Sequence, residues 1–421
     1  MIILGICNDE TASACLMKNG EIIFAASEER FTRKKLDNSF PENSINACLS
    51  FLNIKLLDID IIAYAWAKGF QQDLVEKYLE LGVKYAENPE ALRITKERIK
   101  SEIDRDKTKR QEFDNWVNIN IDRNKQKVLD FYHHEAHAAS AAFFSPFNEG
   151  YVYTSDGRGD FEATTIYQFN RHKDQKLKKI YAAISNDSFG FFYGRITGLL
   201  GFKPMRHEGK ITGLAAYGNP SHAMNLCKKM IDVNDGKVSS NLGEYYSPFF
   251  APYSKKLKKE IGTFKKEDVA AAAQQHLENM MIKLLDFHLK DNDVKKTNLM
   301  CAGGVFGNVK ITQKLKELVC YNDLYKHQIL DHSKSAIFLA KSLKNKNVIG
   351  LINGRMEFGP RALCNRSIIV GTSDRTINDW LNKRMNRTEF MPFAPVMRKE
   401  IANKYIKDFY EEIKNLKNED E

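Results

Sequence analysis

Residues 133–142 read HHEAHAASAA and come shortly after a strand-like segment at 126–131. The alanine-rich run meets no proline before Pro146, so the pattern predicts a helix. His133 and His137 are four residues apart and would stand on one face of that helix, about one turn apart. Two imidazoles placed in this way can ligate a single metal ion. The alternative is a helix start with solvated histidines, which the spacing alone does not exclude.

The composition restricts the class of protein. A chain of 421 residues is long enough for about two or three domains with ample core. The formal net charge of +10 favours an anionic substrate, surface or partner, although lysines can also form only a solvated coat. The seven cysteines are scattered and never in Cys-x-x-Cys spacing, which argues for a reducing cytosol and against a disulfide framework. Because there is neither a signal-peptide pattern nor a membrane-length apolar run, we expect a soluble, cytoplasmic protein without a membrane partner.

Two strand–turn–strand units flank the histidine stretch. Residues 2–26 contain strand-like runs separated by the polar turn NDET at 8–11. Residues 150–169 repeat this scheme around the turn SDGRGD at 155–160. Such turns offer backbone N–H groups to phosphate, and the Asp156 carboxylate can hold a metal or its water. Two such units are typical of an α/β fold built from two duplicated, actin-like lobes.

Glycine-rich and arginine-rich turns farther along the chain suit a phosphate-bearing ligand. Glu208-Gly209-Lys210 precedes a glycine-containing helix, and GGVFGN at 303–308 follows a strand-like run. Glycine at such junctions allows close backbone approach to a nucleotide, and lysine supplies an ammonium group. The segment 354–367 brings three arginines to a glycine-rich turn, which suits an anion. For 208–210 alone, loop packing is the alternative, because the spacer of a Walker loop is absent.

Two charged regions complete the pattern. Residues 70–125 alternate in charge at helical spacing, which predicts a solvent-facing helical hairpin without chemistry of its own. Six lysines between residues 254 and 267 form the densest basic cluster, and a helix is predicted to follow at 268–289.

Together these motifs resemble the ATP-dependent O-carbamoyltransferases that modify nodulation factors and antibiotics such as tobramycin and cephamycin. The resemblance is carried by EERFTRKK at 28–35, HHEAHAAS at 133–140, Asp156-Gly157, Glu208-Gly209-Lys210 with GLA at 213–215, GGV at 303–305 with Asn308, GRMEFGPRAL at 354–363 with NRS at 365–367, and MPFAP at 391–395. The matches keep their order over residues 2–397, and the stretch at 354–367 is close to diagnostic by itself.

The resemblance implies a domain organisation. Residues 1–345 would form an actin-like transfer module related to the enzymes that make threonylcarbamoyladenosine in tRNA, with lobes at about 1–150 and 151–345. Residues 346–421 would begin the C-terminal carbamoyltransferase module. Family members continue much farther past Pro395, so we expect this second module to be truncated. A separate subunit would then supply the missing half, or the chain would work as the transfer half alone.

The resemblance also implies the site. His133 and His137 match the family's metal ligands, and Asp331 matches a third by its position before a helix. His332 is an alternative ligand, because this chain follows Asp331 with HSKS instead of a glycine-rich run. Lys210 joins these three residues in the implied catalytic set. The implied residues for ATP, with Mg²⁺, and for phosphate are Asp9, Thr11, Asp156, Gly157, Glu208, Gly209, Lys210, Gly303, Gly304, Asn308, Arg355, Arg361 and Arg366.

The implied reaction has two steps. Carbamoyl phosphate and ATP form carbamoyl-adenylate, and the carbamoyl group then passes to a substrate hydroxyl beside an iron-type divalent metal. The net charge of +10 favours DNA that carries 5-hydroxymethylcytosine as the acceptor, with a sugar, antibiotic or secondary-metabolite hydroxyl as the alternative. A non-catalytic scaffold that needs a partner subunit, a homo-oligomer, and a hydrolase or kinase of the actin-like superfamily stay open.

Overall fold

The computed structural model describes residues 1–66, 89–241, 245, 253–289, 297–318, 343–344, 348–352, 366–371 and 376–385. The chain divides into two compact units, Met1–Tyr321 and Asn322–Glu421, and each is described by itself. Among the described residues, no helix has both the length and the apolarity that crossing a bilayer requires.

The first unit begins with a five-stranded sheet in the order β3-β2-β1-β4-β5. Its strands are β1 (Ile2–Cys7), β2 (Ser13–Lys18), β3 (Glu21–Ser27), β4 (Ile61–Tyr64) and β5 (Lys127–Asp130). The first three strands form an antiparallel meander, and β4 and β5 join β1 in parallel. Leu4 and Ile62 are fully buried in its core, as the alternating apolar pattern requires.

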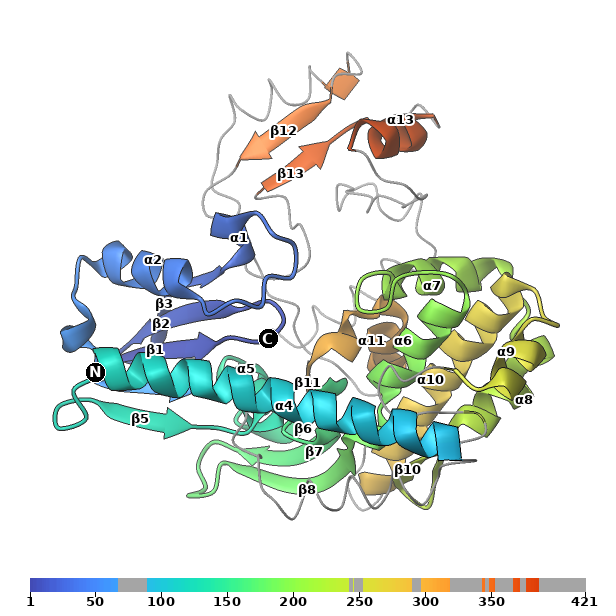
Figure 1. The fold of residues 1–421 in the computed structure, drawn as a ribbon, viewed down its shortest axis with the longest axis horizontal. Helices are drawn as coiled ribbons and strands as arrows, with labels where there is room; N and C mark the ends of the chain where they lie inside the picture. Colours follow the sequence, from blue (N-terminus) through green and yellow to red (C-terminus); the bar gives the residue numbers. More distant parts are fainter. Residues whose placement is uncertain are drawn as a thin grey trace, which may run out of the picture. The chain divides into compact units, whose positions relative to one another are not determined.

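A second sheet repeats this scheme in the order β11-β6-β7-β8. Its strands are β6 (Glu149–Gly159), β7 (Glu162–Asn170), β8 (Leu177–Ile184) and β11 (Leu299–Ala302). Again three strands form an antiparallel meander, and a later strand lies parallel to the first of them. Because both sheets share this topology (Figure 1), the predicted α/β fold of two duplicated, actin-like lobes is confirmed.

Helices pack against both sheets. The central helix of the second lobe is α10 (Lys266–His288), whose alanine-rich segment Val269–Ala273 lies in the core and allows close approach of its neighbours. Within the described residues of the first unit, the helices are α1 (Glu29–Thr32), α2 (Glu42–Leu52), α4 (Pro89–Asn120), α5 (His133–Phe143), α6 (Phe189–Leu199), α7 (Glu208–Leu214), α8 (Pro220–Met230), α9 (Lys255–Ile261), α10 and α11 (Val309–Leu318). Short 3-10 helices occupy Leu56–Asp58, Ser185–Asp187, Ala215–Tyr217 and Gly304–Gly307, and β9 (Ile231–Asn234) pairs with β10 (Lys237–Ser240).

Helix α4 corrects the expectation that the region 70–125 faces solvent. Residues 67–88 lie outside the described residues, and the rest of the region up to Asn120 is one helix of 32 residues. Ile99 and Ile103 are buried in the core of the second lobe, whereas Phe113 and Val117 are buried in the core of the first. The helix therefore belongs to both lobes, and its length can be followed in Figure 1. The sequence does not reveal the burial of α4, because buried charged residues lie on the same face of the helix as the buried apolar residues.

The second unit is described only in part. Strands β12 (Ile349–Ile352) and β13 (Arg366–Ile369) pair in antiparallel fashion, and α13 (Ile377–Arg384) follows them. The predicted ligands Asp331, Arg355 and Arg361 lie outside the described residues. Arg366 is the first residue of β13.

Candidate metal and transfer site

The histidine motif lies at the start of α5, as its pattern predicts. The backbone N–H of His133 donates to Asp160 Oδ2 at 2.6 Å. Asp160 and Phe161, with φ of 49° and 70°, form the two-residue turn between β6 and β7. The side chain of the N-cap residue, Tyr132, does not cap α5. The Asp160 carboxylate, which comes from the second lobe, caps the helix instead. This contact fixes the first turn of α5 against the β6–β7 hairpin.

Three side chains with metal-ligand chemistry meet at this point. The nitrogen and oxygen ligand atoms of His133, His137 and Asp156 all lie within 4.8 Å of one another. Asp156 Oδ2 lies 3.5 Å from His133 Nε2 and 3.2 Å from His137 Nε2. The two imidazole rings are 4.5 Å apart between centroids and nearly perpendicular, at 89°. The histidines therefore share one face of the helix and converge on one carboxylate.

The local shape of β6 places Asp156. The strand runs to Gly159 rather than ending before residue 155, and its pairing with β7 is irregular between Ser155 and Gly159. Such an irregularity redirects a side chain from its regular alternation. Asp156 Oδ1 accepts the N–H of Gly157 at 2.8 Å, which leaves Oδ2 for the histidines. Burial opposes ionisation of this carboxyl, but the adjacent imidazoles outweigh burial and hold its pKa well below the ordinary value.

The geometry of the three groups fits a bound divalent ion. Two ligand atoms about 2.1 Å from one ion lie about 3 to 3.5 Å apart in tetrahedral or octahedral geometry. Both distances to Asp156 Oδ2 agree with this range. In addition, His133 Nε2 is buried and has no hydrogen-bond partner in the described part of the chain. A buried ring nitrogen without a partner costs free energy unless something else, such as a metal ion, binds it.

His134, the remaining histidine of the motif, has a structural role. It is fully buried, its Nδ1 lies 2.7 Å from Thr154 Oγ1, and its Nε2 lies 3.2 Å from the carbonyl oxygen of Glu162. Burial lowers the pKa of its imidazole to about 3, so it stays neutral at physiological pH. The motif therefore divides into two converging histidines and one that anchors the helix to the sheet.

Residues around the histidines restrict their positions. The Trp66 and His133 rings pack in a T-shaped arrangement, with 4.7 Å between centroids and an interplanar angle of 89°. The Arg158 guanidinium lies 5.7 Å from the centre of the Trp66 ring and pairs with Asp106 and Glu102 of α4. At Gly159, an added Cβ would collide with the His133 ring, so glycine is required there. Sequence reasoning missed Trp66, Arg158 and α4, because each lies far from the motif along the chain.

The predicted phosphate turn at residues 8–11 is held by α4. Asp9 forms an ion pair with Arg105, and Asn8 donates to the carbonyl oxygen of Lys109 at 2.9 Å. Thr11 has φ of 61°, a conformation that β-branched residues rarely adopt. The turn is therefore fixed by its surroundings in an unusual backbone shape.

The predicted glycine turn at 303–304 lies beside Asp156. Gly303 has φ of 100°, and a Cβ there would collide with the carbonyl oxygen of Ser155. A Cβ on Gly304 would lie only 3.0 Å from Asp156 Oδ1. The structure thus brings Asp156, Gly157, Gly303 and Gly304 together.

Glu208, Gly209, Lys210 and Asn308, which are also predicted for the nucleotide, lie in the second lobe. Asn308 and Gln274 exchange hydrogen bonds at 2.8 and 3.2 Å, and Tyr193 joins Gln274 to Thr212 of α7. Glu208 Oε1 accepts the backbone N–H of Met205 at 2.7 Å, and burial raises the pKa of the Glu208 carboxyl. Lys210 Nζ lies 5.8 Å from the centre of the Phe202 ring, and a Cβ on Gly209 would meet open space.

Comparison with known proteins identifies the family. The family model of the carbamoyltransferase N-terminus matches residues 2–340, and that of the carbamoyltransferase C-terminus matches residues 340–416. An uncharacterized protein of Methanocaldococcus jannaschii is 30% identical over 96% of this chain and 80% of its own length. The nodulation protein NolNO of Sinorhizobium fredii is 25% identical, over 94% of this chain and 63% of its own length. The 3'-hydroxymethylcephem-O-carbamoyltransferase of Amycolatopsis lactamdurans is 36% identical, over 18% of this chain and 14% of its own length.

Among solved structures, the activator of the 2-hydroxyisocaproyl-CoA dehydratase from Clostridium difficile aligns over 77% of this chain and 88% of its own, with a TM-score of 0.36 and 9% identity. A likeness of this size does not bear on function. The family models cover nearly the whole chain, and they confirm the resemblance that the sequence motifs indicated. The chain belongs to the carbamoyltransferase family.

Proposed function

We propose that this protein transfers a carbamoyl group to a substrate hydroxyl, with carbamoyl phosphate as the source and ATP as the activating nucleotide. The observation that carries the proposal is the convergence of His133, His137 and Asp156 on one point beside the Gly303–Gly304 turn. Transfer of a carbamoyl group to a hydroxyl needs a group that polarises the acceptor hydroxyl or the acyl carbonyl. This cluster offers the ligands for a metal ion that can do so.

The chain's own residues hold and orient that group. His133, His137 and Asp156 would bind a divalent ion of the iron type, with Asp331 as a further ligand by resemblance. When bound, the ion supplies a Lewis acid that lowers the cost of charge on the hydroxyl or carbonyl oxygen. Asp160 fixes the first turn of α5, and Trp66 contacts the ring of His133, so this imidazole is oriented before substrate arrives.

The nucleotide would bind along the same edge of the second lobe. The Gly303–Gly304 turn offers backbone N–H groups next to Asp156, and Lys210 of α7 would supply a cation for phosphate. These residues would stabilise the adenylate phosphate that leaves when the carbamoyl group is transferred, a role that the resemblance also assigns to Arg355, Arg361 and Arg366.

The acceptor is proposed to be a hydroxyl on a small polar molecule. DNA that carries 5-hydroxymethylcytosine is the second candidate, which the net charge of +10 and the exposed lysines of α9 favour. Duplex DNA binding that weakens steeply with added salt supports the second candidate, and salt-independent or absent binding removes it.

The experiment supplies the full chain with carbamoyl phosphate, ATP, divalent iron and a panel of hydroxyl acceptors, including hydroxymethylated DNA. Mass spectrometry is expected to detect an acceptor that has gained one carbamoyl group. His137→Ala and Asp156→Asn are expected to abolish the product, whereas His172→Ala, an exposed histidine in the β7–β8 turn, is expected to keep it. Product formation by His137→Ala would refute the proposed centre. ATP turnover without carbamoyl phosphate and without carbamoylated product would favour a hydrolase or kinase instead.

A further inference from the structure

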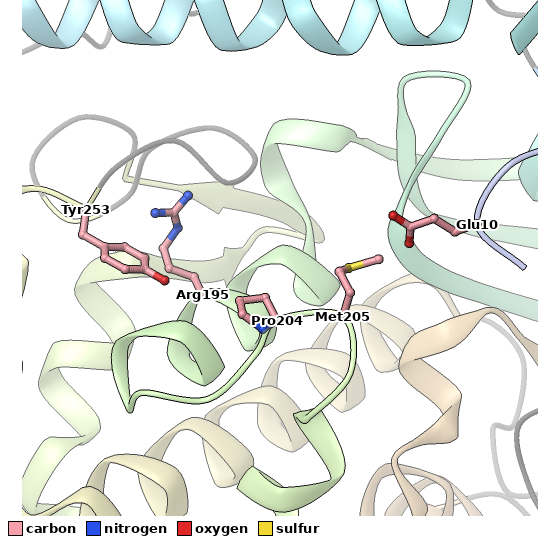
Figure 2. A pocket seen from close by; sticks show the side chains of 5 residues that line it. All are labelled: Glu10, Arg195, Pro204, Met205 and Tyr253. Atoms are coloured by element: carbon pink, nitrogen blue, oxygen red, sulfur yellow. The ribbon is translucent and has the colours of Figure 1, made fainter. Parts of the chain in front are cut away.

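A cavity of about 420 Å³ lies between the two lobes of the first unit. Its lining residues come from distant parts of the chain: Glu10 from the β1–β2 turn, Arg195 from α6, Pro204 and Met205 from the loop before α7, and Tyr253 from the segment before α9. In Figure 2, Glu10 stands at one end of this row and Arg195 with Tyr253 at the other, with Pro204 and Met205 between them. The cavity thus has two chemically different ends separated by an apolar floor.

The Arg195 end is basic. Arg195 is 2% exposed, and its guanidinium lies 5.2 Å from the centre of the Tyr253 ring. Lys258 Nζ lies 5.7 Å from the centre of the same ring. Glycine at 198 is needed to seat this ring, because a Cβ there would collide with the Tyr253 hydroxyl. Two cations at one aromatic ring make this end suited to an anionic group, and the arginine stays charged at all physiological pH values.

The Glu10 end faces the transfer site. Glu10 follows Asp9 in the predicted phosphate turn, and its carboxylate lies 3.9 Å from Arg105 Nη2. Arg105 Nη1 also lies 3.7 Å from Glu102, and Glu102 pairs with Arg158, whose guanidinium lies 5.7 Å from the centre of the Trp66 ring that packs against His133. Ion pairs thus connect the Glu10 end of the cavity to the surroundings of the transfer site. A hydroxyl bound at Glu10 would therefore lie on the side of the cavity toward His133, His137 and Asp156.

We propose that this cavity binds the acceptor, and that the acceptor is a small molecule with a phosphate or carboxylate group at the Arg195 end and its reacting hydroxyl at the Glu10 end. The inference rests on the proposed function, because it names the acceptor of that reaction. The cavity volume lies at the lower end of the range for small-molecule sites, which excludes duplex DNA from the cavity itself. Glu10 accepts a hydrogen bond from the hydroxyl, and Met205 and Pro204 contact the carbon skeleton between the two ends.

Binding measured without any carbamoyl donor tests the inference. The probes are glycerol 3-phosphate, glycerate and glycerol, which share hydroxyl groups and differ in the anionic group. Calorimetry on the full chain is expected to show at least tenfold tighter binding of the two anions than of glycerol. Arg195→Gln is expected to remove this preference. Since Arg195 is buried and its replacement can impair folding, two further variants are used: Lys258→Gln, expected to weaken anion binding several-fold, and Met205→Trp, expected to block the cavity.

The matched control for Lys258→Gln is Lys259→Gln, an exposed lysine one position along the same helix, which is expected to leave binding unchanged. Equal affinities for glycerol and the anions, or equal effects of the two lysine variants, would overturn the inference. Displacement of glycerol 3-phosphate by a non-hydrolysable ATP analogue would also overturn it, because the cavity would then belong to the nucleotide. A failure of the proposed function looks different: the anions bind as expected, but no acceptor in the panel gains a carbamoyl group.

Discussion

Arg158 of β6 and Asp106 of α4 form a two-pronged ion pair in which Nη1 donates to Oδ2 at 2.8 Å and Nη2 donates to Oδ1 at 2.7 Å. Their side chains are only 6% and 5% exposed. The pair joins the strand that carries Asp156 to the helix that holds Asp9 and Asn8. Two segments on either side of the candidate site are therefore fixed by one buried contact.

The first prediction follows from that pair. Asp106→Ala removes one of the two carboxylates that pair with the buried Arg158 guanidinium and leaves Glu102, and removing one partner of a buried pair costs about 3 to 5 kcal/mol in the free energy of unfolding. We expect a loss at the lower end, about 3 kcal/mol, measured by urea-induced unfolding. Arg93→Ala on the same helix removes exposed pairs with Glu90 and Glu97 and should change stability little. Equal effects of the two variants would show that the buried pair does not join the lobes.

The second prediction concerns Gly159. An added Cβ collides with the His133 ring, so Gly159→Ala must move the imidazole or the strand. We expect at least a tenfold loss of divalent-metal affinity, because displacement of a ligand ring costs as much as loss of an outer-shell contact. Gly213→Ala, where a Cβ meets open space, is the control and should retain the metal and gain slightly in stability. Unchanged metal affinity in Gly159→Ala would mean that His133 is not a ligand.

Sequence patterns predicted the elements whose signals are local. The strand pair with its turn at 8–11, the helix at His133 and the glycine turn after β11 all depend on neighbours within a few residues, and the structure contains them. Long-range partners were not predictable in this way. Glu28 lies in the charged run at 28–35, yet it is 1% exposed and accepts the backbone N–H groups of Asn43 and Ser44 at the start of α2.

The candidate site was predictable to the same degree. The spacing of His133 and His137 predicted that the two rings share one face, because residues four apart on a helix are neighbours. The role of Asp156 beside them depends on an irregularity in β6, which shifts the side chain off its regular alternation. The charges of α4 obscured its burial, because their partners, such as Arg158, lie in another lobe. Such pairs become visible only when the chain is folded.

The third prediction is a pH dependence at Asp37. Its carboxylate accepts hydrogen bonds from Thr32 Oγ1 at 2.5 Å and from Ser39 N and Oγ at 2.9 and 2.7 Å, which lower its pKa from 3.8 to about 2. Since the folded pKa is the lower one, this carboxylate stabilises the fold above about pH 4 and loses that effect as the pH falls toward 2. Asp37→Asn should reduce the difference in unfolding free energy between pH 6 and pH 3, measured by chemical denaturation. Asp174→Asn, in the exposed β7–β8 turn, should leave that difference as in the parent chain, and identical pH profiles for all three proteins would refute the assignment.

The fourth prediction concerns the metal itself. Equilibrium dialysis with Fe²⁺ or Zn²⁺, followed by elemental analysis, is expected to give one bound ion per chain. His133→Ala, His137→Ala and Asp156→Asn should each weaken metal binding by at least about tenfold. Each variant alters one of three ligand groups whose ligand atoms lie within 4.8 Å of one another. The exposed His172→Ala should bind as the parent does. Asp331→Ala tests the ligand that only the resemblance supplies: a loss of affinity would add it to the set, whereas a parent-like affinity would exclude it. If all three cluster variants bind like the parent chain, the convergence of His133, His137 and Asp156 is a structural hydrogen-bonded group and not a metal site.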